Sequence, residues 1–169
     1  VGEAWSGHGA GDGASGLAAD DRVVGVARAG EARAYRLRRL NWHEVVKDSL
    51  PTDEGEEPLL VTYCPLCGSA LTAVRRAGDM EATFGVSGLL FRNDLVMYDT
   101  ATDSLWSQVA ATAIRGELTG ETLELVPSTL TTLGEWRETH PETVVLRPPP
   151  DSSTVRGSDA TRDYGRNPY

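Results

Sequence analysis

Two cysteines three residues apart carry the sharpest chemical signal in this sequence. They lie in the run Cys64-Pro65-Leu66-Cys67-Gly68 and are the only cysteines among 169 residues. Random placement would give this spacing only about once in a hundred cases, so we expect the two thiols to act together. Thiols at this spacing bind metals, exchange disulfides or lie inert in a core.

The first interpretation of the pair is a metal knuckle. In a Cys-Pro-x-Cys-Gly turn, proline fixes φ, glycine accepts a left-handed conformation, and successive backbone amides point toward the sulfurs. Residues 64–68 match this pattern, and a strand-like run lies on each side. Knuckles of this kind usually come in pairs, so two further ligands have to come from elsewhere in the chain.

Histidine and methionine are the candidates for the missing ligands. We predict His43 as the third ligand and Met97 as a further candidate, although Met97 also fits core packing in an alternating apolar run. His140, at a helix end, and His8, in a glycine-rich segment, are weaker candidates. Histidine and methionine beside two thiolates would favour copper(I), whereas a carboxylate or water would suit zinc. We therefore expect copper more than zinc, and no organic cofactor.

Two other interpretations of the cysteine pair stay open. In a thioredoxin-like dithiol, the second cysteine opens a helix whose N-terminal amides lower the pKa of the first thiol. Gly68 and the alternating run at residues 69–74 argue against a helix there. The third interpretation is a pair of inert thiols or a local disulfide in a non-catalytic structural or interaction module, such as a subunit of a surface assembly. Whether the protein is an enzyme stays open.

Neighbouring polar residues are expected to have structural roles. The glycine-rich run near residue 87 lacks the spacing of a nucleophile elbow, because Gly88 follows Ser87 directly. Asp94, Asp99 and Asp103 are expected to cap turns through bonds to backbone amides. No catalytic residue is predicted.

Composition limits the classes of partner. Asp and Glu number 25 against 16 Lys and Arg, which gives a formal net charge of −9. Nucleic acid is excluded as a partner, because its phosphates require a basic face that this chain lacks. No apolar run approaches the roughly 20 residues of a membrane span, so none is predicted. A protein partner stays open.

The patterning predicts a mainly β (α+β) fold, with a single mostly antiparallel domain at residues 20–147 and two short helices. A flexible lead-in is expected at residues 1–19 and an extended or disordered tail at residues 148–169. The first helix is expected at residues 40–50, capped by Asn41, and the second at 129–140. Strands are expected at residues 22–27, 31–37, 59–63, 69–76, 81–86, 94–99, 104–108, 122–126 and 143–146.

Six short runs follow one another in an order typical of one protein family. They are residues 31–35, 40–44, 61–68, 84–90, 105–108 and 127–129. Together with Asp163-Tyr164 and Asn167-Pro168-Tyr169, they resemble the bacterial and archaeal family known as domain of unknown function 3179. The resemblance implies that His43 and the cysteines form one constellation. It also implies an exported protein, because family members are largely extracytoplasmic, and in that setting the two cysteines could rest as a disulfide.

Overall fold

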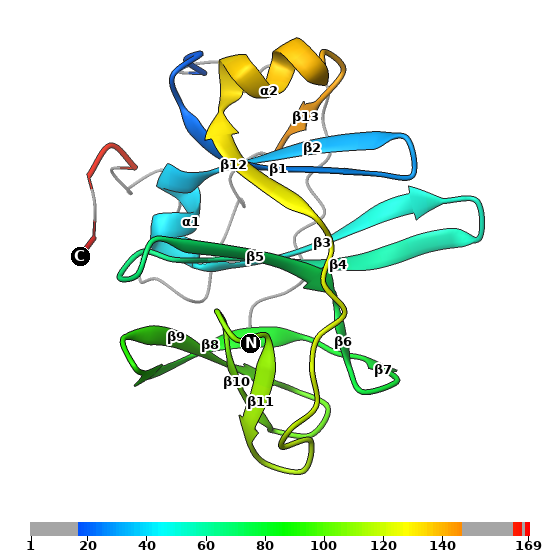
Figure 1. Ribbon diagram of the computed structural model, residues 1–169, viewed down its shortest axis with the longest axis vertical. Coiled ribbons are helices and arrows are strands. Elements are labelled where there is room, and N and C mark those ends of the chain that lie inside the picture. Colours follow the sequence, from blue (N-terminus) through cyan, green and yellow to red (C-terminus); the bar gives the residue numbers. More distant parts are fainter. Residues whose placement is uncertain (1–16, 147–163, 167) are drawn as a thin grey trace.

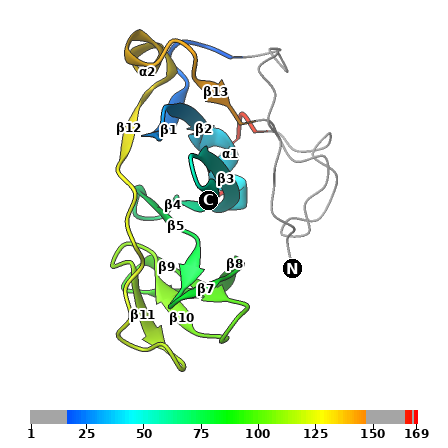
Figure 2. The same cartoon turned by 90° about the vertical axis from the view of Figure 1, so that its right-hand side faces the viewer.

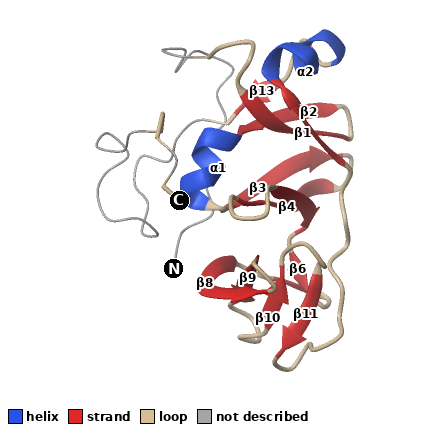
Figure 3. Ribbon diagram, turned by 60° about the vertical axis from the view of Figure 1, so that its left-hand side comes forward, coloured by secondary structure: helices blue, strands red, loops and turns tan. Residues whose placement is uncertain are grey.

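A computed structural model of the protein describes residues 17–146, 164–166 and 168–169. Most of the predicted lead-in and most of the predicted tail lie outside these residues. The proposed domain boundaries therefore stay predictions. Within the described part, the chain is mainly β with two short helices, α1 (Leu37–His43) and α2 (Leu133–Thr139), which confirms the predicted fold class (Figure 3).

The strands form three stacked tiers and one short ribbon. The strands are β1 Arg22–Arg28, β2 Glu31–Arg36, β3 Val45–Thr52, β4 Gly55–Cys64, β5 Ser69–Val74, β6 Arg76–Ala77, β7 Met80–Glu81, β8 Phe84–Phe91, β9 Asp94–Asp99, β10 Leu105–Ser107, β11 Thr112–Arg115, β12 Ser128–Thr132 and β13 Val144–Val145. The first tier has the order β12-β1-β2-β13, the second β3-β4-β5 and the third β11-β10-β9-β8, while β6 and β7 form the ribbon. Figure 1 shows the tiers one above another, and Figure 2 shows them from the side. Among the described strands, all pairings are antiparallel except that of β13 with β2.

Strand β4 lies at the centre and contributes to two apolar cores. Successive side chains of a strand point to opposite faces. Leu59, Val61 and Tyr63 therefore join the core shared with the first tier and α1, whereas Leu60 and Cys64 join the core shared with the third tier. The cysteine site thus starts from the buried half of β4, residues 58–64.

Helix α2 covers the outer face of the first tier. Leu133 and Trp136 pack there with Val23 of β1 and Ala34 of β2. The ring of Trp136 lies over Gly25, where an added Cβ would come within 2.5 Å of ring carbons. A capping box starts the helix, because Thr132 accepts from the Glu135 amide while the Glu135 carboxylate accepts from the Thr132 amide.

The helix predicted at residues 40–50 is wrong in its placement. Helix α1 begins three residues earlier and ends at His43. The next residue, Glu44, has a φ of 57° and turns the chain into β3. β-Branched residues such as Val45 and Val46 favour a strand, and β3 pairs with β4 along all eight of its residues. Pro51 fits within β3 because β3 is an edge strand.

Two further element predictions needed correction. The first residues of the helix predicted at 129–140 form β12, and α2 starts only at Leu133. Residues 122–126 form no strand and make only isolated bridges, while the unpredicted β11 completes the third tier. The first hairpin is confirmed, with positive φ at Ala29 and Gly30 in its turn.

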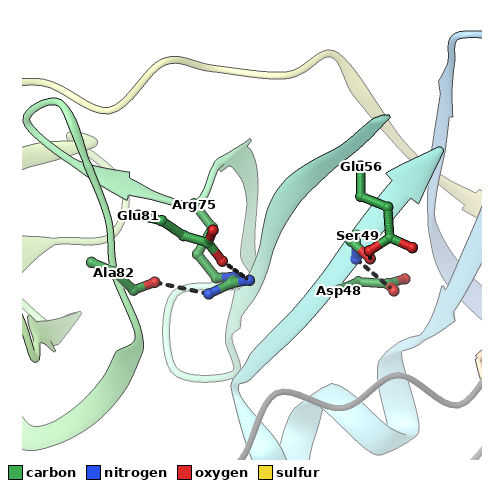
Figure 4. Close-up of polar contacts among 6 residues, drawn as sticks. All are labelled: Asp48, Ser49, Glu56, Arg75, Glu81 and Ala82. Carbon is green, nitrogen blue, oxygen red and sulfur yellow. Dashed lines mark hydrogen bonds and ion pairs between the residues drawn. The ribbon is translucent and has the colours of Figure 1, made fainter. Parts of the chain in front are cut away.

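Buried and part-buried polar contacts connect neighbouring elements. Arg75, after β5, donates to the Glu81 carboxylate at 2.8 Å and to the Ala82 carbonyl at 3.0 Å, which ties the second tier to the ribbon (Figure 4). Between the first and second tiers, the Tyr35 hydroxyl donates to Asp48 at 2.8 Å. Because these contacts cross between elements, they stabilise how the tiers sit on one another.

Candidate functional site

The cysteine turn connects β4 to β5 in a compact reversal. Cys64, the last residue of β4, pairs with Ser69, the first residue of β5. The Gly68 amide donates to the Cys64 carbonyl at 2.8 Å, and Gly68 has a φ of 69°, which favours glycine. The turn therefore has the strand-to-strand setting that the sequence predicts.

The tip of the β8–β9 hairpin brings a carboxylate to this turn. Arg92 and Asn93 both have positive φ and close the hairpin, and Asp94 follows as the first residue of β9. Ligand atoms of Cys64, Cys67 and Asp94 all lie within 4.8 Å of one another. Two sulfurs and one carboxylate oxygen thus form a group that could hold a metal ion.

The two thiols have unequal surroundings. Cys64 is only 1% exposed, whereas Cys67 is exposed, and neither is in a disulfide. Burial raises the pKa of the Cys64 thiol, as does its hydrogen bond to Cys67, while the backbone amides of Cys67, Leu95 and Leu66 act in the opposite direction. Amides directed at a cysteine sulfur are the feature expected of a knuckle.

The carboxylate of Asp94 is fixed through one of its oxygens. Oδ2 accepts from the Ser107 hydroxyl at 2.9 Å and from the Val109 amide at 3.1 Å. Oδ1 faces Cys67, with 3.8 Å between Oδ1 and Sγ. Asp94 is 3% exposed, so its side chain is held between the third tier and the cysteine turn.

A chain of side-chain hydrogen bonds runs inward from Cys67. Its Sγ lies 3.0 Å from Ser69 Oγ, which lies 2.7 Å from Gln108 Oε1. Gln108 Nε2 in turn lies 3.0 Å from Thr62 Oγ1. Gln108 and Thr62 are fully buried, so the chain links the exposed thiol to the interior.

The structure does not bring His43 into this group. Its Nε2 shares a hydrogen bond of 2.9 Å with the Tyr164 hydroxyl, and the two rings lie 5.9 Å apart. The Arg39 guanidinium lies over the same tyrosine ring at 3.9 Å. His43 thus ends α1 facing residues near the C-terminus rather than the sulfurs.

The other predicted ligands also have different surroundings. Met97 is fully buried in the core between the second and third tiers, opposite Trp106 in the β9–β10 register. His140 stacks on Trp136 with ring centroids 3.9 Å apart and shares a hydrogen bond with Thr139. His8 lies outside the described residues.

The described residues near the C-terminus lie beside α1 (Figure 1). Trp42 donates to the Arg166 carbonyl at 3.1 Å, and the Tyr169 hydroxyl donates to the Glu44 carboxylate. Burial raises the pKa of Glu44, partly offset by that hydrogen bond. Burial, Glu44 and, more weakly, Cys64 raise the pKa of Tyr169, so these groups share one neighbourhood.

Exposed apolar side chains border the three-residue group. Leu66 lies between the cysteines and is 50% exposed. Phe91 is 42% exposed and pairs with Asp94 across the hairpin, while Val109, whose amide binds Asp94, is 59% exposed. Three exposed apolar side chains thus lie next to the group of Cys64, Cys67 and Asp94.

Asp94, Ser69 and Gln108 were not among the predicted site residues. Asp94 was assigned to turn capping, a role that Asp99 does have, since it accepts from the Ala101 and Thr102 amides. The signal that could have found Gln108 is its place in the run at residues 105–108, one of the six family-like runs. No pattern in the sequence alone pairs residue 94 with residue 67.

The fold and site define a mainly β protein of stacked sheets that holds two thiols and a carboxylate where two sheets meet. The chain belongs to the family described as "Protein of unknown function (DUF3179)", whose model matches residues 9–169. This match confirms the resemblance inferred from the six runs. No curated protein and no solved structure matches the chain. Neither helix in the described residues is long and apolar enough to cross a membrane.

Proposed function

We propose that the protein binds a metal ion through Cys64, Cys67 and Asp94. The observation that carries this proposal is the convergence of their ligand atoms within 4.8 Å. Two thiolates and a carboxylate oxygen are ligands that zinc accepts, at metal–ligand distances of about 2.0–2.3 Å. Small side-chain movements would bring the three atoms to such distances, and a water molecule or a partner's side chain would complete a tetrahedron.

The donor set favours zinc over copper. The expectation of copper depended on His43 and Met97 as ligands beside the thiols. The Asp94 carboxylate, rather than His43 or Met97, lies within 4.8 Å of the two sulfurs, which supports Asp94 as the third ligand. Copper(I) prefers soft thiolate and thioether ligands, whereas a carboxylate is a hard ligand that zinc accepts.

The exposure of Cys67 favours a role in metal delivery over a purely structural site. Structural zinc sites are closed by four protein ligands, and here three ligands converge, with one thiol exposed. A metal ion beside an exposed thiolate would be open to an incoming ligand from another protein, which would bind the ion in place of that thiolate and allow the ion to be passed on. Leu66, Phe91 and Val109 would supply apolar contacts to that protein.

Metal analysis of protein purified without a chelating tag tests this function. We expect about one zinc ion per chain in the wild type and a large loss in the Cys64→Ser and Cys67→Ser variants. Leu66→Ser is the matched control, because it changes an exposed residue of the same turn and leaves all three ligands in place. Metal content that does not respond to either cysteine substitution would overturn the proposal.

A thiol redox function is the second candidate, and the hydrogen bond between buried Cys64 and exposed Cys67 favours it. Cys67 would attack a substrate disulfide and Cys64 would resolve the mixed disulfide. The substrate would then leave as two thiols, while the cysteines form a disulfide. Thiol counting across a range of glutathione potentials distinguishes this from the alternatives. A reversible two-electron transition without bound metal supports it, whereas a permanent disulfide that resists mild reductant supports the interaction module.

We also propose that the protein acts outside the cytoplasm. Support comes from the family resemblance, because members are largely extracytoplasmic. Fractionation of cells that express the full-length gene would test this location. Recovery of the protein only with cytoplasmic markers would contradict it.

A further inference from the structure

We infer that Ser69 and Gln108 are positioning residues that fix the direction of the hydrogen bond at Cys67 and supply a hydroxyl donor to its metal-bound sulfur. The inference rests on the proposed metal function and deepens it. It depends on the direction of each hydrogen bond between Cys67 and the interior.

The direction starts at a group that can only accept. The Leu71 carbonyl accepts from the Thr62 hydroxyl at 3.1 Å, which uses the single hydroxyl proton of Thr62. Thr62 Oγ1 must therefore accept from Gln108, and only the amide nitrogen of Gln108 can donate. The same nitrogen also donates to the Ser69 carbonyl at 3.3 Å. These contacts of the nitrogen determine that the oxygen end of the Gln108 side-chain amide faces the Ser69 hydroxyl.

The amide oxygen of Gln108 consequently faces the Ser69 hydroxyl. Since Oε1 can only accept, Ser69 donates its proton over the 2.7 Å contact. The Ser69 oxygen can then only accept from Cys67, whose sulfur lies 3.0 Å away. In the metal-free protein, the Cys67 thiol is therefore a donor between two acceptors, Ser69 Oγ and Asp94 Oδ1.

Burial makes this chain rigid. Gln108 and Thr62 have no exposed surface, so water cannot replace a lost partner without a large cost. The backbone N–H of Gln108 also donates to the Leu95 carbonyl at 3.0 Å. The preceding residue, Ser107, holds the Asp94 carboxylate. Ser107 thus positions the proposed ligand Asp94, and the next residue, Gln108, positions Ser69 beside the proposed ligand Cys67.

Metal binding reverses the bond at Cys67. As each thiol forms a metal–sulfur bond, its proton leaves to solvent, so a divalent ion and two thiols give a dithiolate complex and two protons. The Cys67 sulfur can then accept but no longer donate. The Ser69 hydroxyl, 2.7 Å from Gln108 Oε1 and 3.0 Å from the sulfur, then shares its proton between these two acceptors. Such a donor withdraws charge from the sulfur and raises the energy of the thiolate-to-metal charge-transfer band.

Cobalt(II) spectroscopy tests the reversed bond in the metal-bound protein. We expect Ser69→Ala to move the charge-transfer band to lower energy and to weaken cobalt binding by about 10-fold. Ser69→Thr keeps the hydroxyl and should keep the wild-type band, and Ser128→Ala, an exposed site in β12, is the control. An unshifted band in cobalt-bound Ser69→Ala would overturn the inference.

A metal-free measurement separates this inference from the proposed function. In a Cys64→Ser background, Cys67 is the only thiol, and its S–H stretching band can be read by Raman spectroscopy. We expect the further change Ser69→Ala to raise the stretching frequency, because the S–H group loses its nearer acceptor. A wild type that binds no cobalt would refute the metal function and the reversed bond with it. An unshifted S–H band would refute the direction of the chain.

Discussion

Asp94 is held on one oxygen and directed at the thiols with the other. Oδ2 accepts two hydrogen bonds, from Ser107 and Val109, while Oδ1 faces Cys67. Outer contacts of this kind fix the orientation of a metal-ligating carboxylate before the metal arrives. The proposed ligand role of Asp94 therefore depends on the negative charge at Oδ1, which an amide group lacks.

The substitution Asp94→Asn tests that role. Loss of a partner that only hydrogen-bonds to a metal ligand typically lowers metal affinity by about 10–100-fold. We expect the loss of the Asp94 carboxylate to lower zinc affinity by at least as much. Competition with a chromophoric chelator measures the change. Asp103→Asn is the matched control, because Asp103 has a φ of 55°, which asparagine also accepts. Equal affinities for the wild type and Asp94→Asn would exclude the carboxylate as a ligand.

Glu44 is a single buried residue whose effect on stability should depend on pH. Burial raises the pKa of Glu44, so the folded state favours the protonated form. The contribution of Glu44 to stability is then fully present below the ordinary pKa of a glutamate, about 4.3, and is lost as the pH rises through the pKa of Glu44 in the folded state. We expect Glu44→Gln, which keeps an acceptor for Tyr169, to be more stable than the wild type at neutral pH.

Urea unfolding measures this difference in stability between the wild type and Glu44→Gln. The measurements run from about pH 3 to about pH 8, on both sides of the ordinary carboxyl pKa of roughly 4.3. The gain from Glu44→Gln should shrink toward zero at the acidic end. Glu117→Gln is the control, because Glu117 is exposed. A Glu44→Gln variant that is no more stable than the wild type at neutral pH would contradict the expected cost of the buried charge.

Local spacing predicted the cysteine pair but not its carboxylate. The spacing of Cys64 and Cys67 is itself chemical information, because residues this close in sequence share one turn. Asp94 lies 27 residues beyond Cys67 and reaches it only because the third tier packs under the second. An aspartate at a hairpin end looks the same in sequence whether it caps a turn, as Asp99 does, or faces a thiol.

At the scale of elements, the contact of α2 with β1 depends on the absence of a side chain at Gly25. An ideal Cβ there would lie 2.5 Å from carbons of the Trp136 ring, well inside van der Waals contact. The ring cannot move far, because its Nε1 donates to Thr143 at 2.8 Å and His140 stacks against it. The helix therefore docks in one position.

The substitution Gly25→Ala should destabilise the protein by about 1–3 kcal/mol through overpacking. Denaturant unfolding measures the loss. The control is a double-mutant cycle with Trp136→Leu, which removes the ring that the new methyl group would overlap. If Gly25→Ala costs as much with leucine at position 136 as with tryptophan, then contact with the ring is not the cause.

Element types were predictable where local pattern and tertiary pairing agree. The first hairpin, β9 and the presence of two short helices follow from turn residues and periodicity. The helix predicted at residues 40–50 fails because Val45 and Val46 lie on a helical stripe as readily as on a strand. Pairing of β3 with β4 over eight residues decides between the two, and no local signal carries that pairing.

At the scale of the whole molecule, β4 joins the two larger apolar cores. Its alternate side chains enter the core on either face of the second tier. Loss of packing on one face therefore weakens the strand that also carries the other core. We expect the stacked tiers to unfold together rather than as separate units.

Two single substitutions, Leu59→Ala and Leu60→Ala, test this coupling between the cores. Both leucines are fully buried, one in each core, and each change should cost about 2–5 kcal/mol. Unfolding followed by circular dichroism and by tryptophan fluorescence should give coincident single transitions in both variants. Separated transitions in either variant would show that the cores unfold independently.

The position of Trp106 gives the protein its own optical sensor. This indole is fully buried in the same core as Cys64, and its Nε1 donates to Asp99 at 2.9 Å. An indole in such a dry, rigid environment emits at short wavelength, and a paramagnetic ion such as cobalt(II) nearby quenches that light. Cobalt(II) binding at the proposed site should therefore lower the emission of Trp106, which can be measured in the native chain without an attached dye.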